Sequence, residues 1–169
     1  MAIKQGSMRQ VVNNIYQILI NDAELLRLLY YYPKDATNLD PLDAELEEIK
    51  DKEDYFDIVD DRIILAEKDT DLVNKAICRI YITQGRRRPV FSNYLLATQE
   101  IMISVYTHEK YEVDMRNAWI SDRISELIAL EYIEGTLTSK LEYFGGNPRV
   151  TVKGYKKFDH VFEYTTNKK

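Results

Sequence analysis

The chain has 169 residues, of which 45% are hydrophobic and 30% charged, and a net charge of −5. These values are typical of a globular domain, and the net acidity argues against general affinity for nucleic acid across the whole molecule. The single cysteine, Cys78, excludes an intrachain disulfide framework and a zinc-ligand cluster. No apolar run approaches the roughly 20 residues that cross a bilayer, and Met1–Ser7 lacks a signal-peptide pattern. We therefore expect a soluble protein that is made in the cytoplasm.

Two short helices are predicted at the N-terminus. Along Met8–Ile20 the apolar side chains recur at helical spacing, and Ser7 is placed to cap the first turn. Asn21–Glu24 then has the pattern of a new N-cap followed by an acidic residue. Tyr30–Pro33 ends the second helix, because proline cannot continue it.

Residues 35–71 form an acidic segment with fifteen acidic and four basic residues, whereas the rest of the chain is mildly basic. We interpret it as a partly helical excursion on the surface of the domain, with a helix that begins at Asp40–Pro41. Asp60 and Asp61 could bind a divalent cation, but the Asp/Gly spacing of a calcium loop is missing. A solvated acidic face is therefore favoured over a metal site.

Four segments alternate apolar and polar side chains with a period of two, which is the pattern of half-buried strands. These segments are Lys75–Thr83, Gln99–Tyr106, Thr136–Phe144 and Phe158–Tyr164. An exposed loop is predicted between the first two strands, at Gln84–Thr98, because this segment is longer than a tight hairpin turn, and a break in the chain is predicted at Gly145–Pro148.

A helix is predicted between the second and third of these strands. Asp114 is placed to cap its N-terminus, and Gly135 to end it in the left-handed conformation that glycine adopts without strain. Its apolar stripe consists of Trp119, Ile120, Ile124, Leu127, Ile128 and Leu130.

Together these elements predict an α+β fold with a mostly antiparallel four-stranded sheet and helices packed on one face. We expect one domain over residues 1–169, with the acidic excursion at 35–71. The thirteen tyrosines suit strands and sheet edges, or an interface that is also exposed to water.

Three consecutive arginines, Arg86, Arg87 and Arg88, follow a glycine in the predicted loop. Their guanidinium groups could clamp phosphates, or could pair with acidic side chains on a neighbouring subunit. A solubilising loop tip is the third interpretation.

Two acid–base pairs lie in the predicted central helix, namely Asp114 with Arg116 and Asp122 with Arg123. Residues one or two apart do not share a helix face, so each side chain is expected to have a partner elsewhere. A contact between subunits is one possibility.

Catalytic signatures are missing from the sequence. His108 and His160 are its only histidines, and an acid–base role would need a nearby carboxylate or nucleophile, so core or rim positions are expected for both. Serine nucleophile elbows, phosphate-binding glycine loops and His-Glu-x-x-His are absent. We therefore expect no catalytic residues, no cofactor and no metal.

The layout of residues 74–166 resembles the neck proteins of long-tailed bacteriophages, in particular tail terminator (tail completion, head–tail joining) proteins. The resemblance rests on strand–loop–strand, on Asp114-x-Arg116 opening a helix with Ile120–Ile124, and on a strand pair that ends in Phe162–Thr166. It implies a small subunit that forms a ring, often hexameric, and ends the tail tube. Such a ring joins the tail to the head connector, while DNA passes through its lumen without tight binding. The acidic excursion departs from the compact form of that family, which leaves the exact neck position open.

The first hypothesis is thus a virion structural protein of the neck or tail, assembled in the host cytoplasm, that contacts tail tube and connector proteins but no membrane. The alternative is a regulatory protein that binds nucleic acid through Arg86–Arg88. A small enzyme is the third and least favoured hypothesis.

Overall fold

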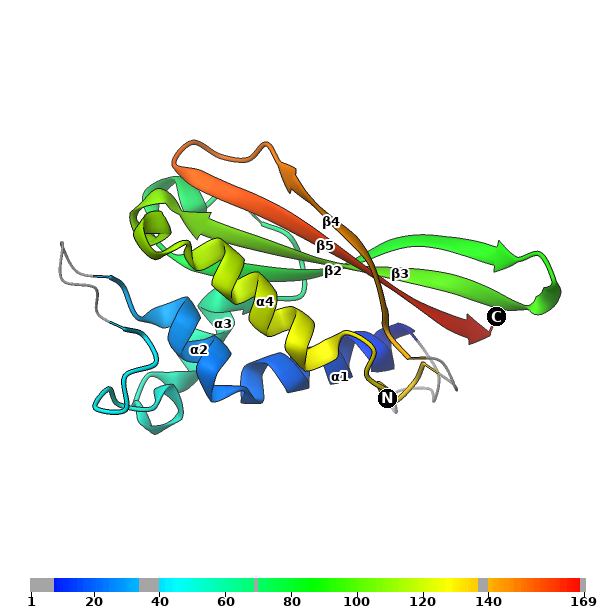
Figure 1. Ribbon diagram of the computed structural model, residues 1–169, viewed down its shortest axis with the longest axis horizontal. Helices are drawn as coiled ribbons and strands as arrows, with labels where there is room; N and C mark the ends of the chain where they lie inside the picture. The colour runs from blue at the N-terminus through cyan, green and yellow to red at the C-terminus, as the bar shows by residue number, and fades with distance from the viewer. Residues whose placement is uncertain (1–7, 34–39, 69, 137–139, 168–169) are drawn as a thin grey trace.

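The structure is a computed structural model, and it describes residues 8–33, 40–68, 70–136 and 140–167. It is an α+β fold in which a long twisted sheet lies over a layer of helices (Figure 1). The helices and strands are, in chain order, α1 (Met8–Asn21), α2 (Ala23–Tyr30), the 3-10 helix η1 (Ile49–Asp51), α3 (Tyr55–Arg62), β1 (Ile63–Ile64), η2 (Leu72–Asn74), β2 (Cys78–Val90), β3 (Asn93–His108), η3 (Glu109–Asp114), α4 (Arg116–Ile128), β4 (Glu142–Arg149) and β5 (Tyr155–Asn167).

The sheet has five strands in the order β1-β2-β3-β5-β4. The short strand β1 runs parallel to β2, and all other neighbours are antiparallel. The predicted sheet was therefore correct in being mostly antiparallel but wrong in having four strands. The fifth strand, Ile63–Ile64, comes from the acidic segment, where two residues are too short for a period-two pattern to reveal a strand.

The main hydrophobic core lies between one face of the sheet and helices α1, α2 and α4. Within the body of the sheet, alternate side chains of β2, β3 and β5 belong to this core, as the alternation in the sequence predicts, whereas the far half of β2 is exposed. The fully buried members of this core include Ile80, Ile103 and Phe162 from the strands and Ile15, Leu28 and Ile124 from the helices.

The opposite face of the sheet is partly covered by side chains from residues 61–68 and 70–75. A small cluster forms there around Tyr81 and Tyr106, with Leu72 packed against them. The buried Arg79 donates hydrogen bonds to the carboxylates of Asp61 (2.6 Å) and Asp71 (3.0 Å). The acidic segment is thus not entirely a solvated face, because some of its carboxylates neutralise a buried cation.

The N-terminal helices form as predicted. The main-chain N–H of Leu25 donates to the Asp22 carboxylate at 2.7 Å, which makes Asp22 the N-cap of α2. Ser7 lies outside the described residues. The helix predicted to begin at Asp40–Pro41 is wrong, because this stretch forms turns. The guanidinium of Arg27 binds the main-chain carbonyls of Asp43 and Leu46, both at 2.7 Å, and such contacts stabilise a non-helical course.

The loop predicted at Gln84–Thr98 is also wrong, since β2 continues to Val90, β3 begins at Asn93, and the two strands pair. Strand β1 pairs only with Ile80 and Tyr81, so the far half of β2 has a partner on one side alone. Pro89 removes no ladder hydrogen bond at such an edge, and the irregular register between Gln84 and Arg87 accommodates the glycine between them.

Strand β4 differs from its prediction in the same way. Gly145–Pro148 is part of the strand instead of a break, with an irregular register between Tyr143 and Gly145. Since β4 is the other edge of the sheet, glycine and proline are tolerated there. The predicted strand began at Thr136, whereas β4 begins at Glu142; residues 137–139 lie outside the described part of the chain.

Helix α4 is shorter than predicted at both ends. Asp114 does not cap it; Met115 occupies that position in the left-handed conformation, with φ of 58°. The helix ends at Ile128, seven residues before Gly135, because the main chain of Leu130 and Glu131 turns away to bond with Leu141.

Candidate interaction surfaces

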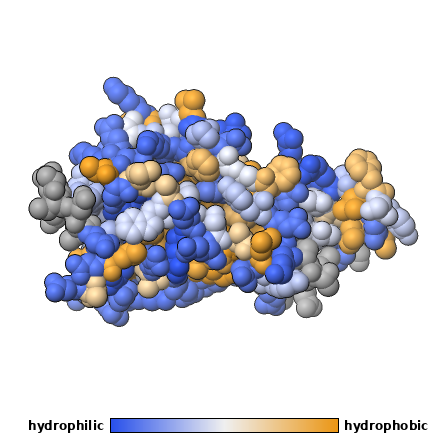
Figure 2. Space-filling view, viewed as in Figure 1, coloured by the Kyte–Doolittle hydropathy of each residue, from blue (hydrophilic) through white to orange (hydrophobic). Residues whose placement is uncertain are grey.

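The hairpin of β2 and β3 extends from the body of the molecule, and we name its residues 84–97 the arm (Figure 1). Strand β5 pairs with β3 only as far as Leu96, so the tip of the arm lies beyond the rest of the sheet. Three large apolar side chains are exposed there: Phe91 fully, Tyr94 to 77% and Leu95 to 59%. Figure 2 shows apolar side chains gathered at this end of the molecule. Exposed apolar clusters of this kind mark interaction sites.

The three arginines lie on strand β2 of the arm and not on a loop. The guanidinium of Arg88 forms ion pairs with the carboxylates of Glu163 and Glu100. Arg87 donates to the main-chain carbonyl of Asn167. Arg86 has an exposed side chain, and its main-chain N–H donates to Glu100 at 2.9 Å. Arg87 and Arg88 thus have partners within the chain for their guanidinium groups, whereas the side chain of Arg86 is exposed.

Asp114 and Arg116 bind each other, which the sequence did not predict, and among the residues that the structure describes only Arg116 also has the partners elsewhere that were expected of both. Their side chains form an ion pair at 2.7 Å, since the left-handed Met115 turns the chain back between them. Arg116 is fully buried and also donates to the main-chain carbonyls of Leu28 (2.6 Å) and Tyr31 (2.7 Å). This pair therefore ties α4 to the end of α2.

Asp122 and Arg123 have different surroundings. Arg123 pairs with the carboxylate of Asp22 at 2.7 Å and with Glu126 at 3.0 Å, and these contacts keep its pKa above the ordinary range of arginine. Its partners are thus within the chain. Asp122 is exposed on α4, at the rim of a pocket.

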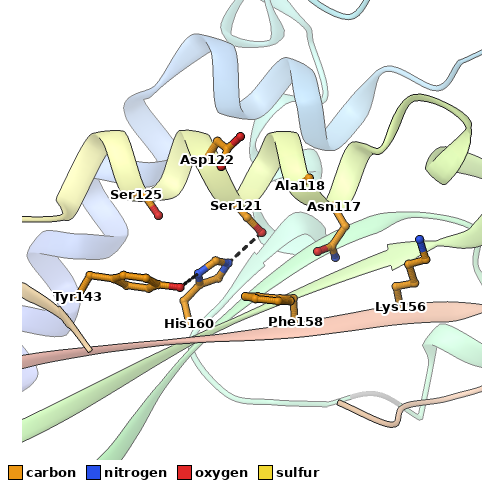
Figure 3. A pocket seen from close by; sticks show the side chains of 9 residues that line it. All are labelled: Asn117, Ala118, Ser121, Asp122, Ser125, Tyr143, Lys156, Phe158 and His160. Atoms are coloured by element: carbon orange, nitrogen blue, oxygen red, sulfur yellow. Dashed lines mark hydrogen bonds between the residues drawn. The ribbon is translucent and has the colours of Figure 1, made fainter. Parts of the chain in front are cut away.

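This pocket lies between α4 and strands β4 and β5, with a volume of about 440 Å³ (Figure 3). His160 on β5 points into it and is almost fully buried. Its Nε2 lies 2.9 Å from the hydroxyl of Ser121, and its Nδ1 lies 3.2 Å from the hydroxyl of Tyr143. The rest of the lining is Asn117, Ala118, Asp122, Ser125, Lys156 and Phe158.

Burial lowers the pKa of His160 to about 4, and the nearby carboxylates of Asp159 and Asp122 only partly oppose this effect. The imidazole is therefore neutral at pH 7. A neutral imidazole has one N–H donor and one acceptor nitrogen, so it can satisfy both hydroxyls at once. The sequence predicted a core or rim position for this residue, and the alternation Phe158, His160, Phe162 was the signal for it. No group of three or more metal-binding side chains occurs within the described residues.

A second hollow of about 480 Å³ lies on the other face of the sheet, at the base of the arm. Gly85, Met102 and Val161 form part of its lining, together with the exposed ring of Phe144. The sequence could not reveal this hollow, because its lining comes from four strands that are distant in the sequence, and the register is irregular near Gly85 and Gly145.

Comparison with known proteins assigns the chain to a family. Residues 22–164 match the YomW family. The chain belongs to this family. The SPbeta prophage-derived uncharacterized protein YomW of Bacillus subtilis (strain 168) is 31% identical over 135 residues, which cover 73% of this chain and 77% of that protein.

Among solved structures, this YomW-family chain is similar to a chain in the virion of a native gene transfer agent particle. The TM-score is 0.56, and the match covers 94% of this chain and 96% of the other. Because only 14% of the aligned residues are identical, the similarity concerns the fold. No helix in the described part of the chain is long and apolar enough to span a membrane.

Proposed function

We propose that this YomW-family chain is a structural protein of the phage virion, which forms a ring in the neck, terminates the tail tube and joins the tail to the head connector. The observation that carries the proposal is the shared fold, which extends over nearly the whole length of a chain from a gene transfer agent virion. The prophage origin of the relative in Bacillus subtilis supports it independently.

The shape of the molecule suits such a role. A ring subunit acts through the surfaces that it presents to its neighbours. Here a sheet-and-helix body with a buried core carries an arm with an exposed apolar tip. DNA that slides through the lumen of a ring should not be bound tightly, which agrees with the net charge of −5 and with the pairing of Arg88 to Glu163.

We also propose that the chain is not an enzyme and that the contact between Ser121 and His160 is structural. In a serine hydrolase, the second nitrogen of the histidine binds a carboxylate that orients the ring. Here the Nδ1 of His160 contacts the hydroxyl of Tyr143 instead. The contact connects α4 to β4 and β5, which is a sufficient role for it (Figure 3).

A stop codon in the gene of a phage that encodes this chain tests the proposed function. We expect filled heads and separate tails of abnormal length in electron micrographs, because the tube is neither terminated nor joined. Purified protein added to growing tail tubes is expected to limit their length and to leave a ring at one end. Normal virions from the mutant phage would contradict the proposal.

A further inference from the structure

The two ends of the molecule carry complementary surfaces. At one end is the arm, with the apolar tip of Phe91, Tyr94 and Leu95 and the exposed side chains of Arg86 and Arg87. The other end is the acidic segment around the start of α3 (Figure 1). The two surfaces differ in charge, and each exposes at least one aromatic ring.

We name the second surface the acidic face, and it consists of Glu53, Asp54, Phe56, Asp57 and Asp60. All five side chains are exposed, and the ring of Phe56 is exposed to 77%. No ion pair neutralises these four carboxylates within the described residues. The lysines that directly precede this surface in the sequence have other partners: Lys52 pairs with Glu47, and Lys50 donates to a main-chain carbonyl of α1.

We propose that the arm of one copy docks on the acidic face of a second copy. The tip would cover Phe56, while Arg86 and Arg87 would approach carboxylates that lack a cation. Charge complementarity favours this partner over a second arm, which would place the arginines against each other. The contact deepens the proposed function, since a ring needs an interface between its subunits.

The placement of the two surfaces gives this contact a direction. Because the two surfaces lie toward opposite ends of the long axis, the arm of one copy cannot reach the acidic face of the same copy (Figure 1). The contact is therefore head-to-tail: each copy uses its arm on one neighbour and its acidic face on the other. Such heterologous contacts generate closed rings when the rotation between copies closes, and filaments when it does not.

Two variants of the full chain separate the two halves of the contact. The arm variant is Phe91→Ser with Tyr94→Ser, and the acid variant is Asp54→Lys with Asp57→Lys. Matched controls change equally exposed residues outside both surfaces: Val150→Ser with Tyr132→Ser, and Glu109→Lys with Glu131→Lys. Circular dichroism establishes that each variant is folded, because all the changed side chains lie outside the core.

Light scattering after size-exclusion chromatography then measures the mass of each sample. We expect the wild type and both controls to form species larger than a dimer, and each variant alone to be a monomer. An equimolar mixture of the two variants is expected to form dimers and nothing larger, because only one arm and one acidic face remain intact in the pair.

A strictly monomeric wild type, an acid variant that assembles like the wild type, or folded variants that stay monomeric when mixed would each overturn the proposed interface. The proposed function has a separate readout in the tail tubes. If a variant still assembles and caps the tubes, the proposed interface is wrong and the proposed function stands. If the wild type assembles head-to-tail but leaves the tubes uncapped, the interface stands and the proposed function is wrong.

Discussion

Arg116 shows how a single buried side chain connects elements that are distant in the sequence. Its guanidinium has no exposed surface and binds the carboxylate of Asp114 and two main-chain carbonyls at the end of α2. Removing the Arg116 side chain would leave the carboxylate of Asp114 without its counter-charge and the two carbonyls without their hydrogen-bond donor. The residue therefore stabilises the fold.

We expect Arg116→Ala to lower the free energy of unfolding by about 3–5 kcal/mol, the usual cost of breaking a buried ion pair. Urea denaturation measures this change. The matched control is Arg123→Ala, whose ion pairs are partly solvated and whose loss is expected to cost about 0.2–1 kcal/mol. Equal losses for the two variants would contradict the structural role of Arg116.

His160 makes stability depend on pH. Because its pKa falls to about 4 in the folded chain, against 6.5 for an ordinary histidine, the unfolded state binds more protons between these values. Stability is thus fully present above pH 6.5 and is lost as the pH falls toward 4, by about 3 kcal/mol for such a shift. Unfolding of the wild type and of His160→Gln across this range, with an NMR titration of the ring, measures the effect. A ring that titrates near pH 6.5 in the folded chain would contradict it.

At the scale of residues, the sequence identified charged side chains but could not identify their partners. Glu163 is 75 positions from Arg88, and Asp22 is 101 positions from Arg123. Only the sheet register and the packing of α4 on α2 bring them together. Asp114 and Arg116 were misjudged because the spacing argument assumes a continuous helix, whereas Met115 is left-handed.

At the scale of elements, strand β4 depends on close approach at one glycine. A Cβ atom at Gly146 would lie 2.4 Å from the ring of Phe158 and 2.6 Å from the hydroxyl of Tyr143. Both neighbours line the pocket around His160, so the strand could not keep its place beside β5 with a side chain there.

We therefore expect Gly146→Ala to destabilise the chain by about 1–3 kcal/mol through overpacking. Thermal unfolding measures the loss, and the neighbouring exposed change Asn147→Ala is the control, with an expected effect near zero. The NMR signals of the His160 ring report its contacts with the two hydroxyls. We expect these signals to change in Gly146→Ala and to stay the same in Asn147→Ala. An unchanged melting temperature for Gly146→Ala would show that β4 can move away.

Periodicity predicted the first half of β2, the central parts of β3 and β5 and the helices α1, α2 and α4, since each of these segments contributes to the main core. It failed at the two edges of the sheet. Gly85, Pro89 and Gly145–Pro148 usually interrupt strands, but an edge strand has a neighbour on one side only and tolerates them. The arm was therefore hidden from the sequence analysis, and with it the candidate interface.

At the scale of the whole molecule, charge distribution separates the proposed function from a regulator that binds nucleic acid. The net charge is −5, and Arg88 is neutralised by Glu163. We expect a dissociation constant for duplex DNA weaker than about 10⁻⁴ M at physiological salt. Fluorescence anisotropy with Arg86→Ala, Arg87→Ala and the wild type tests this. Tight, salt-dependent binding that the substitutions abolish would favour the regulator.

The extension of β2 and β3 past the end of β5 has a consequence for how this family can change. Packing of the core does not constrain the residue types at Phe91, Tyr94 and Leu95, because none of these side chains belongs to the core. Substitutions at these three positions therefore carry little penalty for folding. The residues at the tip can therefore change in step with the protein surface that they contact, while the residues of the core stay the same.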